Sequence, residues 1–231
     1  MAPYIAGIYV SHNQGVEAIV AASTLATMGI TIVRQSKLLK NAASEGGNPT
    51  AYPKTLLGKL VTPMHAVTML GIPVSYLIAV LSNSFHQPEW YTDLGGFPVE
   101  LDLKAGVGGK AAIRTVAALA GIPMIYLQSW IFKTLGKQLH AIAPREKAEI
   151  VSTGPYAYVR HPGYTVATLQ VALWAPAFWS WIPLVGAGVC LILFGYKTTV
   201  EEKLIEDDLT LGVQYREYKK KVPYRLIPYV Y

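Results

Sequence analysis

The chain alternates between long apolar runs and short segments rich in polar and charged residues. A helix needs about 20 mostly apolar residues to cross roughly 30 Å of hydrocarbon. Five runs approach that length, at residues 18–33, 60–81, 115–132, 165–181 and 182–199. The pattern predicts an all-α, multi-pass membrane protein with about five spanning helices.

The last two apolar runs follow one another with only a short interruption. Residues 174–183 contain three tryptophans and two prolines. Indole rings favour the membrane interface, and proline interrupts a helix. This segment therefore predicts a tight turn at a membrane surface, although a packed aromatic core cluster is an alternative interpretation.

Composition excludes an ordinary soluble domain. Hydrophobic residues make up 52% of the chain and charged residues 15%, whereas soluble domains carry roughly 25% charged residues. The net charge of +6 comes from loops and the C-terminal tail, not from a basic patch on a polar fold, so we expect membrane lipids and no nucleic acid as partners. Cys190 is the only cysteine. The sequence therefore has no cysteine–histidine cluster, and we expect no metal site.

The charged loops predict an orientation, because positively charged loops stay in the cytosol. Five basic residues and one acidic residue separate the first two runs: Arg34, Lys37, Lys40, Lys54, Lys59 and Glu45. Residues 82–110 instead hold four acidic residues and two lysines, while the loop after the third run and the tail are basic. We expect a lumenal N-terminus and a cytosolic C-terminus.

The chain is divided into two regions. Residues 1–135 contain three spanning helices, and residues 136–231 form a C-terminal region with a helical hairpin and a tail.

The candidate chemistry lies in the second of these regions. Arg160 and His161 precede a helix whose start is set by Pro162, and the N-terminus of a helix attracts anions. Glu201 and Glu202 end the last apolar run, and the two ends of a helical hairpin are neighbours. Both signs of charge should therefore surround a cytosolic cavity suited to a zwitterionic, positively charged ligand. The alternative is a set of exposed ion pairs, worth about 0–1 kcal/mol each.

The run Gly154-Pro-Tyr156, then Arg160-His161-Pro162-x-Tyr164, an apolar hairpin, Glu201-Glu202 and Tyr215-x-x-Tyr218 resembles the isoprenylcysteine carboxyl methyltransferase family. It is similar also to the wider set of membrane methyltransferases that includes phospholipid N-methylating enzymes. The resemblance covers about residues 150–223, and its Arg-His-Pro-x-Tyr and Glu-Glu motifs at hairpin distance are fairly specific.

The resemblance implies S-adenosylmethionine as cofactor, no metal, and a set of site residues. Those expected to bind the cofactor are Ile150, Val151, Gly154, Tyr156, His161, Pro162, Gly163, Tyr164, Glu201 and Glu202. Lys197 falls where the prenylcysteine enzymes have an arginine for the substrate carboxylate, and Arg160 is the expected catalytic residue, orienting the anionic group of the acceptor together with Lys197. Several positions depart from the family pattern. Ala148 replaces a histidine, Ala141 stands at a glutamine position, and Val166 stands at the position of a small residue. The spacing from Glu201-Glu202 to Gly212 is about two residues longer than usual, and Lys197 loses the bidentate carboxylate recognition of arginine.

These observations predict an integral membrane methyltransferase of the endoplasmic reticulum that acts on a lipophilic acceptor, with the carboxylate of a prenylated cysteine as the leading candidate. A carboxylate is deprotonated at neutral pH, so its methylation needs no general base. A phospholipid or a small lipophilic molecule is an alternative acceptor. A membrane reductase using NADPH is a second alternative, although the acidic pair suits the 2′-phosphate poorly. A non-enzymatic transporter or scaffold would rely on His65 and Gln128 inside helices, where such residues usually serve packing.

Overall fold

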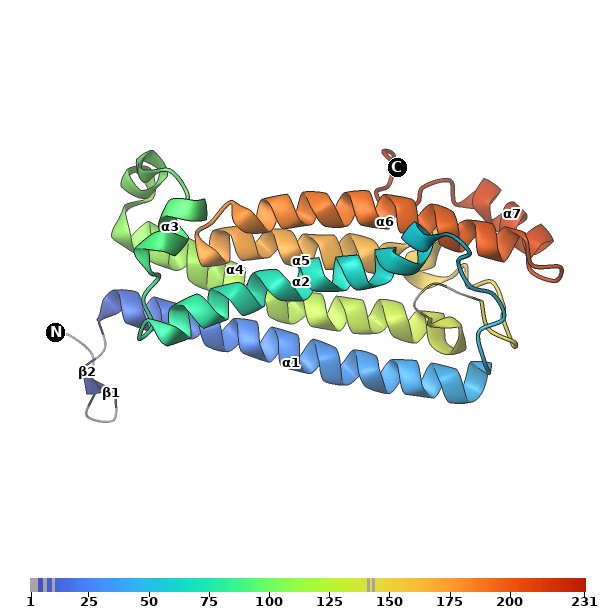
Figure 1. Ribbon diagram of the computed structural model, residues 1–231, viewed down its shortest axis with the longest axis horizontal. Coiled ribbons are helices and arrows are strands. Elements are labelled where there is room, and N and C mark those ends of the chain that lie inside the picture. Colours follow the sequence, from blue (N-terminus) through green and yellow to red (C-terminus); the bar gives the residue numbers. More distant parts are fainter. Residues whose placement is uncertain (1–3, 6–7, 10, 141, 143) are drawn as a thin grey trace. The chain divides into compact units, whose positions relative to one another are not determined.

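The computed structural model describes residues 4–5, 8–9, 11–140, 142 and 144–231, and it confirms the all-α prediction (Figure 1). The helices are α1 (His12–Gly46), α2 (Leu56–Ser82), α3 (Glu89–Gly95), α4 (Val99–Leu135), α5 (Pro162–Phe178), α6 (Ile182–Glu206) and α7 (Gly212–Lys221). Single 3₁₀ turns, η1 (Gly136–Gln138) and η2 (Gly154–Ala157), follow α4 and precede α5. Two short antiparallel strands, β1 (Tyr4–Ile5) and β2 (Ile8–Tyr9), lie before α1.

The chain is an integral membrane protein. In the described residues, α1, α2, α4 and α6 are long and apolar enough to cross a membrane. The fourth predicted run, at residues 165–181, forms α5, which has 17 residues and is therefore shorter than these four. The helices also extend beyond the apolar runs; α1, for example, has 35 residues and includes the basic residues Arg34, Lys37 and Lys40. An apolar run marks only the part of a helix that lies in hydrocarbon, because backbone hydrogen bonding continues into the polar flanks.

The long helix α4 contains a break near its start. Gly106 has φ +67° and ψ 167°, a conformation that glycine adopts at little cost because it lacks a Cβ. Pro123 lies further along the same helix, where it removes one backbone hydrogen bond. Two helical segments therefore meet at Gly106 within α4.

The chain divides into two compact units, each drawn from several helices. The first comprises residues 1–29, 68–124 and 169–188, and the second comprises residues 30–67, 125–168 and 189–231. The division at residues 135 and 136 that the sequence favours concerns function and stays a prediction.

In the first unit, a buried ion pair joins α1 to α4. Arg114 Nη1 lies 2.6 Å from Glu17 Oε1, and the Tyr76 hydroxyl donates to Glu17 Oε2 at 2.5 Å. Arg114 Nε donates to the carbonyl oxygen of Ala177 at 3.0 Å, and the Tyr76 ring stacks on Phe178 with centroids 3.8 Å apart. Charges among apolar groups need such partners, so this cluster fixes how α1, α2, α4 and α5 pack within the unit.

The turn predicted between the last two apolar runs is present in the first unit. Helix α5 ends at Phe178 and α6 begins at Ile182, and Trp179 has φ +55° in the connection. Trp174 and Trp179 are buried, whereas Trp181 is exposed. The segment thus combines a tight turn with aromatic packing.

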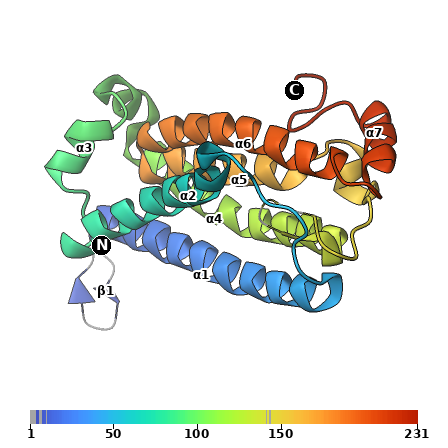
Figure 2. The ribbon, with the colours of Figure 1, turned by 45° about the vertical axis from the view of Figure 1, so that its right-hand side comes forward.

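In the second unit, the C-terminal tail runs beside the start of α5. The backbone N–H groups of Arg160 and His161 donate to the carbonyl oxygens of Tyr224 and Arg225, at 3.0 and 2.8 Å. Figure 2 shows α7 and the tail following the end of α6. The tail therefore lies against the motif that the sequence singles out.

A buried arginine organises the loop after α4 in the second unit. Arg145 Nη1 donates to the carbonyl oxygen of Gly47 at 2.7 Å, and its Nε and Nη2 donate to the carbonyl oxygen of Leu139 at 3.2 and 3.0 Å. Because one rigid guanidinium binds two separate backbone segments, it fixes the polypeptide that leads to residue 150.

Candidate active site

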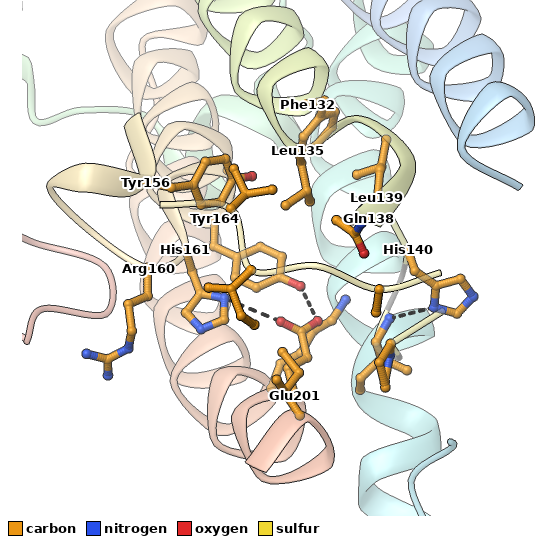
Figure 3. Close-up of a pocket in the computed structure, with 18 of the residues that line it drawn as sticks. Phe132, Leu135, Gln138, Leu139, His140, Tyr156, Arg160, His161, Tyr164 and Glu201 are labelled. Carbon is orange, nitrogen blue, oxygen red and sulfur yellow. Dashed lines mark hydrogen bonds and ion pairs between the residues drawn. The ribbon is translucent and has the colours of Figure 1, made fainter. Parts of the chain in front are cut away.

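The second unit contains a cavity of about 530 Å³, which lies within the usual range for ligand pockets. Its walls come from α1, α2, α4, α5, α6 and α7 and from the loop after η1 (Figure 3). The lining is mainly apolar, with a few polar side chains. This composition is typical of a site that binds an organic ligand.

Most of the predicted site residues line this cavity: Ile150, Val151, Tyr156, Arg160, His161, Gly163, Tyr164, Lys197 and Glu201. Gly154, Pro162 and Glu202 do not appear in its wall. Gly154 has φ +57° and begins η2, and Pro162 is the first residue of α5, so both shape the backbone that carries Tyr156 and His161. The roles assigned to all these residues stay predictions.

Two carboxylates line the cavity, Glu149 and Glu201, and Glu201 is the one that lies beside the motif residues. It accepts a hydrogen bond from the Tyr164 hydroxyl at 2.5 Å, and its Oε2 lies 3.5 Å from His161 Nδ1. His161 and Tyr164 are three residues apart at the start of α5, so their side chains share one helical face. Figure 3 shows these three side chains turned toward one another.

An aromatic column continues from this carboxylate along the cavity. The rings of His161 and Tyr164 are nearly parallel, with centroids 5.8 Å apart. Tyr164 stacks in turn on Phe194 of α6 at 4.4 Å. The column orients the Tyr164 hydroxyl toward Glu201 and gives the cavity a rigid aromatic wall.

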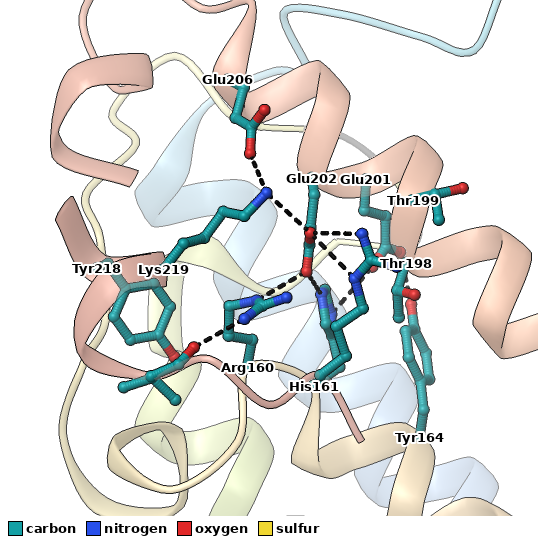
Figure 4. Close-up of polar contacts among 12 residues, drawn as sticks. Arg160, His161, Tyr164, Thr198, Thr199, Glu201, Glu202, Glu206, Tyr218 and Lys219 are labelled. Carbon is teal, nitrogen blue, oxygen red and sulfur yellow. Dashed lines mark hydrogen bonds and ion pairs between the residues drawn. The ribbon is translucent and has the colours of Figure 1, made fainter. Parts of the chain in front are cut away.

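Glu202, the next residue of α6, faces a different environment (Figure 4). Its Oε1 accepts from Arg160 Nε at 2.8 Å and from His161 Nε2 at 3.2 Å. Its Oε2 lies 3.4 Å from Lys219 Nζ and 3.2 Å from Arg225 Nη2. The side chain is 2% exposed, so this carboxylate is a buried hub that joins α5, α6, α7 and the tail.

Arg160 completes the same hub. Its Nη1 donates to the carbonyl oxygens of Val222 and Pro223, both at 2.7 Å. In Figure 3 its guanidinium extends away from Glu201. Its observed contacts therefore hold the tail against α5, and the predicted catalytic role stays a prediction.

Lys197 lies one helical turn before Glu201 on α6. It is 2% exposed, and its ammonium lies 5.1 Å from the centroid of the Tyr164 ring, within cation–π distance. A buried ammonium on the cavity wall is chemically suited to an anionic group, and the substrate-binding role expected of Lys197 stays a prediction.

Two loop residues and α7 supply further polar groups to the cavity. Burial raises the pKa of Tyr156, and Tyr218 and Glu201 raise it further, while the Tyr218 hydroxyl donates to the carbonyl oxygen of Tyr156 at 2.6 Å. Burial lowers the pKa of His140, with Arg145 and Lys197 acting in the same direction. At neutral pH both Tyr156 and His140 are therefore uncharged.

Sequence reasoning missed several residues that line the cavity, among them Thr62, His65 and His140. Thr62 and His65 lie on α2, far along the chain from the motif. A polar side chain within an apolar run was the only local signal that they gave.

The fold and the site define a class: a multi-pass membrane protein with a ligand cavity among its helices, in which a carboxylate, an ammonium and aromatic rings face one another. Comparison with known families is more specific. Residues 117–207 match the model of the isoprenylcysteine carboxyl methyltransferase (ICMT) family. No curated protein matches the chain.

The resemblance seen in the sequence is confirmed by this match. The matched segment is similar to the ICMT family over less than half of the chain, and it includes His161, Tyr164, Lys197 and Glu201. The match and the apolar helices together indicate a membrane methyltransferase, and a membrane setting favours a lipophilic substrate.

Proposed function

We propose that the protein transfers a methyl group from S-adenosylmethionine to the carboxylate of a prenylated cysteine. One observation carries this proposal. Glu201 lies on the cavity wall between the Tyr164 hydroxyl and the His161 ring, and Lys197 lies one turn away in the same family-matched segment. A cation-binding group and an anion-binding group thus share one cavity.

The donor set of the cavity fits the proposed cofactor. S-adenosylmethionine combines an ammonium, a carboxylate and a sulfonium with an adenosine. Glu201 supplies a carboxylate for positive charge or ribose hydroxyls, and the ring of Tyr156 suits a flat base or a sulfonium. Ile150 and Val151 line the same wall. When bound, the cofactor supplies an electrophilic methyl group.

The remaining lining supports a lipophilic acceptor. Leu39 of α1, Ala66 of α2, and Phe132 and Leu135 of α4 contribute apolar surface to the cavity. Lys197 binds the acceptor carboxylate, which is ionised at neutral pH and needs no general base. The protein contributes alignment of the reacting groups and exclusion of water.

Arg160 serves this reaction by position. It binds Glu202 and the tail carbonyls, and through its backbone it begins the segment that carries His161 into the cavity. The gain from alignment depends on displacements of about 1 Å, so a group that fixes the start of α5 affects turnover without contacting the substrate.

A phospholipid acceptor is the second candidate, and Lys197 is the observation that favours it. A lysine ammonium is a point charge that suits phosphate, whereas arginine matches a carboxylate in a bidentate manner. A reductase that uses NADPH is disfavoured, because Glu201 on the cavity wall would repel the 2′-phosphate.

We place the protein in the endoplasmic reticulum membrane, with its N-terminus in the lumen and its C-terminus in the cytosol. The basic loops and tail support this orientation. Glycosylation sites introduced before residue 12 and after residue 221 test it: only the N-terminal site is expected to be modified.

Methyl transfer from radiolabelled S-adenosylmethionine tests the proposed reaction. The purified protein is given N-acetyl-S-farnesylcysteine in one assay and phosphatidylethanolamine in another. We expect label in a base-labile ester of the farnesylcysteine. Label in the phospholipid alone would establish the second candidate, and label in neither acceptor would refute both.

A further inference from the structure

Two polar residues of α2 face the cavity but have no part in the site described above. Thr62 and His65 line the cavity together with Lys197 of α6. They are three residues apart, so they share one face of α2. Their hydrogen-bonding groups indicate which chemical groups of the bound acceptor they contact.

His65 lines the cavity with a ring that has one hydrogen-bond acceptor. Its Nδ1 lies 3.0 Å from the carbonyl oxygen of Val61, and because a carbonyl only accepts, Nδ1 carries the proton. In the neutral ring, Nε2 then has a free lone pair on the edge away from the α2 backbone. A second positive charge beside Lys197 in the same cavity would be unfavourable, which keeps the ring in this neutral form.

Packing fixes the orientation of the His65 ring. It lies against Phe194, with centroids 5.0 Å apart and an interplanar angle of 53°. Phe194 also stacks on Tyr164. His65 therefore ends the aromatic column that begins at His161, and its lone pair has a fixed direction.

The Thr62 hydroxyl lacks a partner. Its Oγ1 is buried and makes no hydrogen bond to any described residue. Threonine hydroxyls in helices commonly bond the carbonyl four residues earlier, as Thr24 and Thr168 do here. A buried polar atom that forgoes this bond while lining a cavity points to a hydrogen bond with a ligand.

Lys197 supplies the third group. Its ammonium is buried over the Tyr164 ring and makes no hydrogen bond to the described part of the chain. A cation, a hydrogen-bond acceptor and a hydroxyl therefore meet one cavity from two helices. A head group that matches them bears an anionic oxygen next to an N–H donor.

We propose that Thr62, His65 and Lys197 form the head-group subsite of the acceptor, in which Lys197 binds the carboxylate and His65 Nε2 accepts from the adjacent amide N–H. The Thr62 hydroxyl donates to the carboxylate. The subsite selects a prenylcysteine whose amino group is acylated, and which therefore has an amide N–H beside the free carboxylate, over a prenylated acid that lacks the amide. This inference rests on the proposed function and adds to it the residues that set acceptor specificity.

Two acceptors test the subsite in the full-length protein. N-acetyl-S-farnesylcysteine carries the amide N–H, and S-farnesylthiopropionic acid lacks the amide. The wild type should prefer the former by about tenfold in kcat/KM, the ratio expected for one hydrogen bond. His65→Phe keeps a ring against Phe194 and should remove the preference, because it raises the KM of N-acetyl-S-farnesylcysteine alone.

Matched variants and a binding readout separate recognition from structure. His65→Gln retains an acceptor oxygen and should restore part of the preference. Thr62→Val should raise the KM of both acceptors, whereas Thr62→Ser should not. In all four variants the KM for S-adenosylmethionine and the stabilisation by S-adenosylhomocysteine should match the wild type. Additional stabilisation by N-acetyl-S-farnesylcysteine should be lost in His65→Phe.

Equal turnover of the two acceptors by the wild type would overturn the subsite, as would an undiminished preference in His65→Phe. If His65→Phe does not fold, the Thr62→Val and Thr62→Ser pair decides, and equal KM values in that pair overturn it. If neither acceptor is methylated although S-adenosylhomocysteine stabilises the protein, the prenylcysteine acceptor is wrong and the subsite falls with it.

Discussion

Two neighbouring acids at the end of α6 differ in what surrounds them. Glu201 faces the cavity, where its partners are a tyrosine hydroxyl and one edge of His161. Glu202 faces the tail, where Arg160, Lys219 and Arg225 join the other edge of His161 around it. The carboxylate with free space beside it is suited to a ligand, and the one enclosed by cations is suited to structure. Burial of a charge does not by itself indicate a binding site.

The largest expected effect comes from a substitution of Glu202, the acid that faces the tail. Glu202→Gln leaves Arg160 buried without its counter-charge, and breaking a buried pair costs about 3–5 kcal/mol of unfolding free energy. Chemical denaturation in detergent measures the loss. Glu217→Gln, which removes an exposed partner of Lys220, is the matched control and should leave the midpoint unchanged. Equal midpoints for the two variants would show that Glu202 is not a hub.

Arg160→Lys tests the contacts around Glu202 more finely, because it keeps the positive charge and loses the planar guanidinium. The guanidinium binds Glu202 through Nε and the carbonyl oxygens of Val222 and Pro223 through Nη1, and a single ammonium does not reproduce this fork. We therefore expect a loss of about 3 kcal/mol together with faster proteolysis of the tail. Full stability with abolished methyl transfer would instead support direct catalysis by Arg160.

Tyr164→Phe acts on the cavity side. It removes the hydroxyl that donates to Glu201 but keeps the ring stacked on Phe194. A hydrogen bond to a charged group contributes about 2 kcal/mol, so the unfolding free energy should fall by that amount, and the affinity for S-adenosylhomocysteine should fall as well. Unchanged affinity for S-adenosylhomocysteine would show that the Tyr164 hydroxyl has no part in the cofactor site.

The smallest expected effect comes from Tyr218→Phe on α7. The substitution removes the donor to the carbonyl oxygen of Tyr156, a neutral hydrogen bond worth about 1 kcal/mol. A modest shift in the thermal midpoint, with ligand binding retained, is the expected result. A loss as large as that of Glu202→Gln would mean that α7 is held mainly by this bond.

The sequence predicted the spanning helices and the meeting of two charged segments, because both follow from local patterns. Apolar runs mark the parts of helices that lie in hydrocarbon, and a short hairpin brings residue 160 near residue 201. The sequence did not separate Glu201 from Glu202, since their difference depends on where Val222 and Arg225 pack in three dimensions. Thr62 and His65 were outside the predicted site for the same reason: their place depends on how α2 packs beside α6 in the second unit.

Thermal unfolding of the purified protein with and without S-adenosylhomocysteine tests the central claim most directly, with the wild type and Glu201→Gln compared side by side. Ligand at 100 times its dissociation constant should stabilise the wild type by about 2.7 kcal/mol, and Glu201→Gln should still unfold in one transition but lose this gain. An undiminished gain in Glu201→Gln, or stabilisation of the wild type by NADPH in place of S-adenosylhomocysteine, would contradict the account.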